Sequence, residues 1–105
     1  MAKETGVDHN KTVAHELSKA LADTFTIYQK THGYHWNVVG PNFRGLHLLL
    51  EEQYNEIWNS VDEIAERIRA LGQTAPMGAD AFGNLTSIKD GVDREGEHLY
   101  PAFPY

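Results

Sequence analysis

Residues 46–72, LHLLLEEQYNEIWNSVDEIAERIRALG, predict one long amphipathic helix. Apolar residues recur there every three or four positions, which is the period of a helix that buries one side. These positions are Leu46, Leu50, Ile57, Val61, Ile64, Ile68 and Leu71. Proline is tolerated in a first helical turn and glycine favours a stop, so we expect a helix from about Pro41 to Leu71, ended by Gly72.

A second amphipathic stretch precedes this one, from about Asn10 to Trp36, and we expect it to end before Gly40-Pro41. Its stripe consists of Val13, Leu17, Ala20, Leu21, Thr24, Tyr28, Thr31 and His35. Because the link is short, the two helices should be antiparallel neighbours in an all-α hairpin. Prolines and glycines in 73–105 leave room for one short helix, about Asp80 to Lys89, within a connecting segment and an irregular tail.

The bulk composition narrows the function classes. The chain has 105 residues, which suits one domain, and we expect residues 1–9 to form a flexible N-terminal tail. It has no cysteine, a formal net charge of −6 and no clustered basic patch, so thiolate metal sites are excluded and a nucleic-acid surface is not indicated. No apolar run approaches the ~20 residues of a membrane span. Residues 1–11 lack the apolar core of a secretory signal, so we do not expect one. We therefore expect a cytoplasmic protein.

One side of the 41–71 helix carries candidate metal ligands. His47 and Glu51 are four residues apart, as are Asp62 and Glu66, so each pair shares a helix face. His47 and Asp62 are 15 residues apart, or ~22 Å along a helix, which is too far for one ion bound within one chain. An antiparallel copy about a two-fold axis would set His47 against Glu66 and Glu51 against Asp62, because both pairs of position numbers have the same sum. We therefore expect two equivalent metal sites at a homodimer interface, and His35 could join them.

The donor set limits the metal. Imidazole and carboxylate without sulfur suit iron, manganese or zinc. Carboxylates compensate the charge of an ion that changes oxidation state, which favours iron or manganese.

Each residue has a simpler explanation when taken alone. His47 could be a core histidine and His35 a packing residue. Asp62 and Glu66 could be a solvated pair, and Glu51 could pair with Arg44. For Trp36 and Trp58, interface packing is favoured over a redox relay. We expect His9, His15 and His32 at the surface.

Several motifs follow one another in a fixed order. They are Tyr34-His35-Trp36-Asn37-Val38, Gly40-Pro41-Asn42-Phe43, Leu46-His47, Glu51, Asp62-Glu63-Ile64-Ala65-Glu66-Arg67-Ile68 and Leu71-Gly72. This series resembles the Dps family, the ferritin-like mini-ferritins known as DNA-binding proteins from starved cells. The resemblance covers roughly residues 10–91.

The resemblance implies a di-iron ferroxidase centre between two-fold-related subunits. By resemblance, His35 and His47 come from one subunit, Asp62 and Glu66 come from the other, and Glu51 stands where the family has an acidic ligand. The family oxidises Fe(II), preferably with hydrogen peroxide, and stores the ferric mineral in a hollow dodecamer. That chemistry limits hydroxyl-radical formation.

The chain also departs from the family pattern. Family members have a four-helix bundle, and this chain resembles its first two helices, whereas residues 92–105 resemble nothing in the family. We expect the hairpin to expose an apolar face, through which two hairpins could close a bundle as a dimer. The short N-terminal segment is mixed in charge, unlike the Lys-rich tails with which the family often binds DNA. The alternative to a ferroxidase is a non-catalytic helical dimerisation or metal-binding module.

Overall fold

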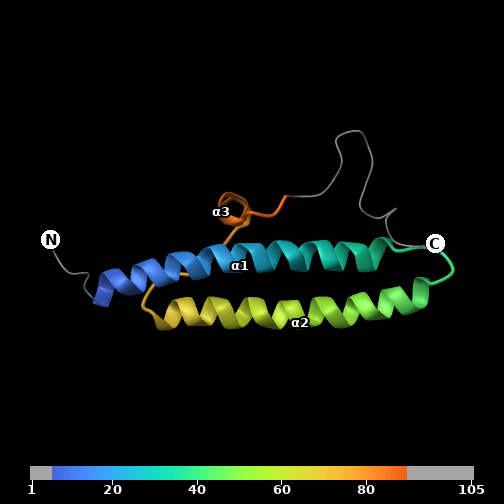
Figure 1. Cartoon of the computed structure of the whole chain (residues 1–105), viewed down its shortest axis with the longest axis horizontal. Coiled ribbons are helices and arrows are strands. Elements are labelled where there is room, and N and C mark those ends of the chain that lie inside the picture. The colour runs from blue at the N-terminus through green and yellow to red at the C-terminus, as the bar shows by residue number, and fades with distance from the viewer. Residues whose placement is uncertain (1–5, 90–105) are drawn as a thin grey trace.

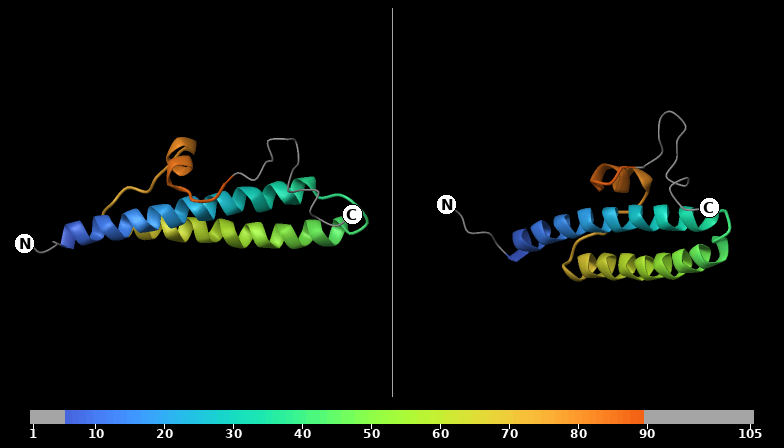
Figure 2. Two further views of the ribbon diagram at one scale, coloured as in Figure 1. Left: turned by 45° about the horizontal axis from the view of Figure 1, so that its top comes forward. Right: turned by 45° about the vertical axis from the view of Figure 1, so that its right-hand side comes forward.

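The computed structural model describes residues 6–89, and every regular element in that range is helical. The helices are α1 (Gly6–Asn37), α2 (Phe43–Ala70) and α3 (Ala79–Leu85). α1 and α2 lie side by side and run antiparallel, and α3 lies on the side of α1 opposite α2 (Figures 1 and 2). The predicted all-α hairpin with one short helix is confirmed.

The helix boundaries differ from the sequence expectation by a few residues. α1 begins at Gly6, so residues 6–9 of the expected N-terminal tail are helical. α2 begins at Phe43 because Gly40 adopts a φ of 108° and its carbonyl accepts a hydrogen bond from the Phe43 N–H at 3.0 Å, which places Pro41 in the turn. Residues 1–5 and the expected tail 92–105 lie outside the described residues.

Gly72 ends α2 as the sequence predicts. Its φ of 82° lies in the left-handed region, which glycine adopts without steric cost. The Gly72 N–H then donates to the carbonyl of Arg69 at 2.9 Å, and the Gln73 N–H donates to that of Ile68 at 3.4 Å. These two bonds form a Schellman motif, which satisfies carbonyls that the helix leaves unpaired.

The core lies between α1 and α2, towards the end away from the hairpin turn. Leu21 and Ile68 are fully buried and form a cluster with Ala14. Burying one such aliphatic side chain contributes roughly 1.5–3 kcal/mol, so this cluster is a main source of contact energy in the hairpin. The partly buried residues around the cluster are Leu17, Val61, Ile64, Ala65, Leu71, Ala75 and Phe82.

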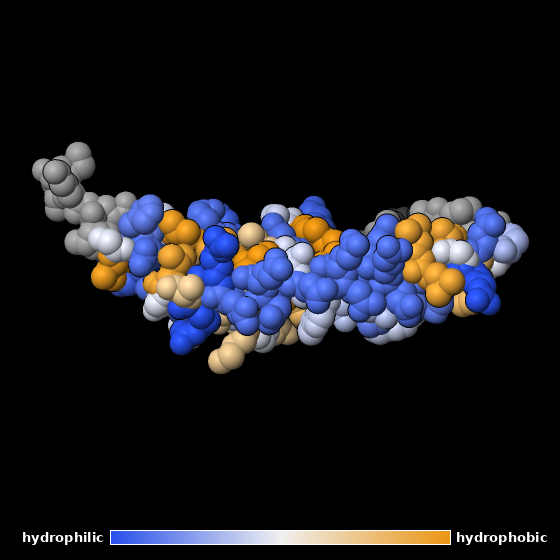
Figure 3. All heavy atoms as spheres, turned by 90° about the horizontal axis from the view of Figure 1, so that it is seen from below, coloured by the Kyte–Doolittle hydropathy of each residue, from blue (hydrophilic) through white to orange (hydrophobic). Residues whose placement is uncertain are grey.

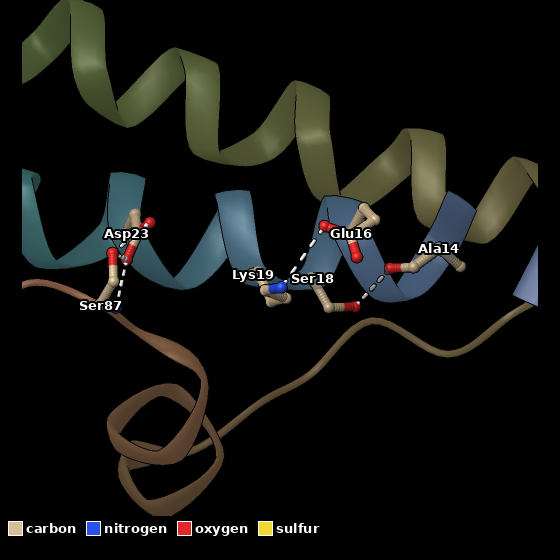
Figure 4. A network of polar contacts seen from close by, with 6 residues as sticks. All are labelled: Ala14, Glu16, Ser18, Lys19, Asp23 and Ser87. Atoms are coloured by element: carbon tan, nitrogen blue, oxygen red, sulfur yellow. Dashed lines mark hydrogen bonds and ion pairs between the residues drawn. The ribbon is translucent and has the colours of Figure 1, made fainter. Parts of the chain in front are cut away.

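The segment after α2 is attached to α1 by one aromatic and several polar contacts. Phe82 of α3 stacks on Phe25 with ring centroids 4.8 Å apart. Beyond α3, the Asp23 carboxylate accepts a hydrogen bond at 2.7 Å from the Thr86 hydroxyl. It accepts another at 2.7 Å from the Ser87 N–H, and Figure 4 shows Ser87 beside Asp23. The bond from Thr86, followed by that from Ser87, lowers the pKa of Asp23 below its ordinary value.

These contacts explain why α3 is shorter than expected. Thr86 has an extended backbone (φ −71°, ψ 143°), so α3 ends at Leu85 instead of continuing to Lys89. The extended conformation allows residues 86 and 87 to turn their donors towards Asp23, 63 and 64 positions away in the sequence.

The outer surface is mixed in character. Seen from the α2 side, hydrophilic residues run along the middle of the molecule, and hydrophobic residues gather towards both ends (Figure 3). The large apolar side chains with substantial exposure are Val7, Ile27, Trp36, Val39, Phe43, Leu48, Leu49, Trp58 and Met77. Within residues 6–89, no helix is both long and apolar enough to cross a bilayer.

Candidate metal centre

Two histidines join the ends of α1 and α2 at the hairpin turn. The His35 Nδ1 lies 2.8 Å from the backbone carbonyl oxygen of His47, and the His47 Nδ1 lies 2.8 Å from that of His35. Their rings are stacked, with centroids 3.6 Å apart and planes at 20°. His35 is 7% exposed and His47 is half-buried. The sequence placed His35 near the site only as an option, whereas the structure brings the two imidazoles into contact.

This reciprocal arrangement fixes the tautomer of both rings. A carbonyl oxygen can only accept a hydrogen bond, so each Nδ1 must carry the proton and donate it. In a neutral imidazole the lone pair then lies on Nε2, the atom that binds a metal. Metal-bound histidines in proteins commonly donate their other ring N–H to a carbonyl in this way. Within residues 6–89, the Nε2 of each ring forms no hydrogen bond, so both atoms are available to bind a cation.

An aromatic cluster surrounds the histidine pair. The Tyr54 ring lies edge-on to His35, with centroids 5.1 Å apart, and stacks on His32 at 3.9 Å and 11°. Phe43 stacks on His47 on its other side at 4.8 Å. His32 is half-buried, so the expectation of a surface histidine is wrong, whereas His9 and His15 are exposed as expected. Burial, and then the charge of nearby His35, lowers the pKa of His32.

The signal for His32 was present in the sequence. Tyr28, His32 and His35 are separated by four and three positions, so they share the face of α1 that meets α2. The Tyr28 hydroxyl lies 2.8 Å from the Nδ1 of His32, and Trp58 packs on the Tyr28 ring at 4.9 Å.

The three candidate carboxylates are exposed on α2. Glu51, Asp62 and Glu66 form no ion pair within residues 6–89, so the alternative pairing of Glu51 with Arg44 does not occur there. In the part of the chain that the structure describes, no three histidine or acidic residues come close enough to hold a metal ion. Within the described residues, one copy thus contains a contacting pair of imidazoles and three carboxylates that form no ion pair.

The donor chemistry fits a ferrous ion. Two neutral imidazole nitrogens with oxygen ligands and no sulfur suit Fe(II), and also Mn(II) and Zn(II). Within residues 6–89 of one copy, no carboxylate lies close enough to His35 and His47 to complete a group of three ligands. Nothing in one copy favours one of these three metals over the others.

Comparison with known proteins places this hairpin in a family. Residues 14–99 match the model of the ferritin-like domain. The chain therefore belongs to the ferritin-like family.

Within that family, the similar proteins include several named as Dps, as the sequence motifs indicated. DNA protection during starvation protein 2 of Bacillus anthracis is 40% identical over 81 residues, which are 77% of this chain and 56% of that protein. An uncharacterised low temperature-induced protein of Nostoc is 40% identical over 83 residues, which are 79% of this chain and 46% of that protein. The chain spans about half the length of the curated relatives it matches.

The solved structures agree with the sequence relatives. The Dps protein of Vibrio cholerae, described as a member of a broad superfamily of ferritin-like diiron-carboxylate proteins, superposes with a TM-score of 0.81 at 31% identity. The match covers 89% of this chain and 62% of the Vibrio protein. The antiparallel α1–α2 hairpin is thus a Dps-type arrangement.

Proposed function

We propose that this chain oxidises Fe(II) and sequesters the product at a centre shared by two copies. His35 and His47 of one subunit bind the ferrous ion, together with Asp62 and Glu66 of the partner subunit, and Glu51 completes or bridges the site. Hydrogen peroxide or dioxygen accepts the electrons. Iron is the substrate, and its removal limits oxidative damage by iron and peroxide. Manganese or zinc could occupy the same ligands.

The observation that carries this proposal is the reciprocal bonding of His35 and His47. Each Nδ1–H is committed to a backbone carbonyl at 2.8 Å, so each Nε2 is the nitrogen left for a cation. The ion then gains two oriented ligands without any ring having to rotate. The three carboxylates are exposed and form no ion pair in the part of the chain that the structure describes, so they can supply charge compensation when the ion loses an electron.

The antiparallel register has further support from the residues between the ligand pairs. A two-fold axis near the middle of α2 that sets His47 opposite Glu66 also sets Trp58 opposite Asn55 and Leu48 opposite Ala65. Trp58 is 49% exposed and Leu48 is 48% exposed in one copy, although large apolar side chains are favoured in buried interface centres. Association in this register would cover both side chains.

A mixing experiment tests whether the centre is shared. We expect His47→Ala and Asp62→Asn each to abolish tight Fe(II) binding, measured calorimetrically on the metal-free protein without oxygen. In a dimer made of one copy of each variant, one site carries both substitutions, and the other site keeps the native His47 and Asp62. Random exchange of two equal samples should therefore restore about a quarter of the wild-type sites. The matched control is Glu52→Gln, which removes a charge from an exposed α2 residue and should leave binding unchanged.

The outcomes separate the candidate functions. Restored binding, with ferric absorbance after peroxide is added, supports the shared ferroxidase. Binding without oxidation supports the alternative of a metal-binding dimerisation module. Unchanged binding in both variants, or no restoration on mixing, contradicts the shared centre.

A homo-oligomer is part of the proposal, while the dodecamer, a cytoplasmic location and the absence of DNA binding stay predictions. Measuring the size of the protein in solution tests the dodecamer. A mobility-shift assay at low salt tests the absence of DNA binding.

A further inference from the structure

The exposed side of α2 carries a second seam of residues at helical spacing, beside the inner seam that packs on α1. The inner seam, to which Leu50, Ile57 and Ile68 belong, is buried or half-buried. The outer seam lies about 100° further round the helix and advances by alternating steps of four and three, the spacing along which two helices pack. In one copy, all of its members are exposed except Ala65, which is half-buried. The outer seam consists of Arg44, Leu48, Glu51, Asn55, Trp58, Asp62, Ala65 and Arg69.

The two-fold register of the proposed centre maps this outer seam onto itself. All four pairs of the seam have the same sum of position numbers, so each member meets another member of the seam. Two of the pairs carry no charge. A third sets Glu51 opposite Asp62 of the partner subunit, and the proposed metal ion relieves the repulsion of these carboxylates. The fourth sets Arg44 opposite Arg69 of the partner subunit, once at each end of the interface.

No acidic side chain within residues 6–89 of one copy neutralises these arginines. Arg44 forms no hydrogen bond or ion pair there. The first turn of α2 has no acidic residue, and Glu51, the next acid along the helix, lies ~10 Å further on. Arg69 donates one N–H to the carbonyl of Gln73 at 3.0 Å and forms no ion pair in the described part of the chain. Across the interface, the acid one turn from the pair is Glu66 of the partner subunit, which the proposed function gives to the ferrous ion.

We propose that an oxyanion of the phosphate class binds between Arg44 of one subunit and Arg69 of the partner subunit, at each end of the dimer. The inference rests on the proposed function, because it needs the same register, and it adds an anion site beside each metal site. Guanidinium groups bind phosphate oxygens through two parallel N–H bonds, so two of them can hold one tetrahedral anion. Arg44 lies three positions before His47, which sets the anion ~4.5 Å along α2 from the metal ligand.

The site exists only when two copies associate, because each copy supplies one arginine to each end. Phosphate binding and association must therefore strengthen each other. Chloride at the same ionic strength screens the same charges but cannot accept hydrogen bonds from both guanidinium groups in this paired geometry. A response to phosphate beyond that to chloride is thus the signature of the site.

Calorimetric titration with inorganic phosphate tests the proposal. The full chain is loaded with Zn(II), which suits the same ligands without redox chemistry, freed of excess metal and titrated at an ionic strength held constant with chloride. We expect one phosphate per chain. Arg44→Gln and Arg69→Gln should each weaken phosphate binding by about tenfold or more, because each removes charge-assisted hydrogen bonds. The matched control is Arg67→Gln, which removes the same charge from an exposed residue of the last turn of α2, outside the outer seam.

Mixing the two arginine variants tests whether the site is shared. In a dimer with one copy of each variant, one end keeps the native Arg44 and Arg69, and the other end carries both substitutions. Random exchange of equal samples should therefore restore about a quarter of the wild-type phosphate sites. Full binding in Arg44→Gln or Arg69→Gln, which would place the phosphate on the metal, overturns the inference. An equal loss in Arg67→Gln, or no restoration on mixing, overturns it as well.

Sedimentation of the same samples separates this inference from the proposed function. We expect phosphate to lower the dimer dissociation constant severalfold relative to chloride in the wild type and in Arg67→Gln, but not in Arg44→Gln. A metal-loaded dimer that does not respond to phosphate overturns the anion site and leaves the proposed function standing. A chain that binds neither Zn(II) nor Fe(II) and stays monomeric removes the proposed function, and the shared register with it.

Discussion

Replacing His47 by phenylalanine is expected to destabilise the fold more than the same change at His35. The two hydrogen bonds have equal lengths, 2.8 Å, but their acceptors differ. The His35 carbonyl belongs to the last turn of α1, where carbonyls have no partner in the helix, and no backbone N–H within the described residues bonds to it. The His47 carbonyl lies inside α2, where the helix already supplies a donor four residues on.

The magnitudes follow from this difference. His47→Phe leaves a carbonyl without its donor, which costs about 1–3 kcal/mol of unfolding free energy. His35→Phe removes only the second of two hydrogen bonds to the His47 carbonyl, which keeps its partner within α2. This loss costs about 0.5–1.5 kcal/mol of unfolding free energy, before any gain from burying a more apolar ring. Phenylalanine keeps a flat ring, so the stacked contact is largely retained in both variants.

Urea unfolding of the metal-free protein in the presence of a chelator measures the loss of unfolding free energy in each variant. Unfolding is followed by far-ultraviolet circular dichroism at one fixed protein concentration. His9→Phe, at an exposed site in α1, is the control for the added apolar ring. Equal losses at positions 35 and 47, or a larger loss at 35, would refute the reasoning from helix position.

Two further predictions concern the backbone and the α3 attachment. Gly72→Ala should destabilise by about 1–2 kcal/mol in the same urea assay because the left-handed backbone penalises a Cβ, while Gly45→Ala, inside α2 with open space around it, should stabilise by about 0.5–1 kcal/mol. A loss of similar sign at both glycines would contradict this. Asp23 has a folded-state pKa below its ordinary value of 3.8, so its contribution is complete above that value and is lost as the pH falls through the lower, folded-state pKa. The protection of the Ser87 amide, which is its exchange rate compared with the intrinsic rate at the same pH, should therefore be lost only on acidification in the wild type and at every pH in Asp23→Ala; unchanged protection in the variant would show that this bond does not hold the segment.

The hairpin was predictable from sequence because its signals are local. Apolar spacing, the Gly40-Pro41 link and Gly72 each act within a few residues, and they gave two antiparallel helices with small boundary errors. Ala20, assigned to the buried stripe, is exposed, whereas Ala22 is buried. A helical stripe assumes one packing partner, but α1 contacts both α2 and α3.

The candidate site was predictable in composition but not in detail. Spacing placed His47 and the carboxylates on one side of α2 and indicated that one ion could not bind both His47 and Asp62 of a single chain. The reciprocal bonds of His35 and His47 depend on how two helix ends meet across the turn, which no periodic pattern encodes. The Asp23 contacts join positions 63 and 64 apart, which local patterns do not reveal. The prediction for His32 was wrong because Tyr54, from the other helix, covers its ring.

The hydrogen bonds that hold the rings of His35 and His47 also have a kinetic consequence. Rotation of either ring by half a turn would exchange Nδ1 with Cδ2 and break a hydrogen bond to the opposite helix, so ring flips at positions 35 and 47 should be rare on the timescale of ion capture. In the proposed centre, the entropy of ordering these two side chains would then be lost once, when the chain folds, and not again each time an ion binds. Capture speed would accordingly depend on how quickly ions diffuse to the hairpin end and shed their hydration water.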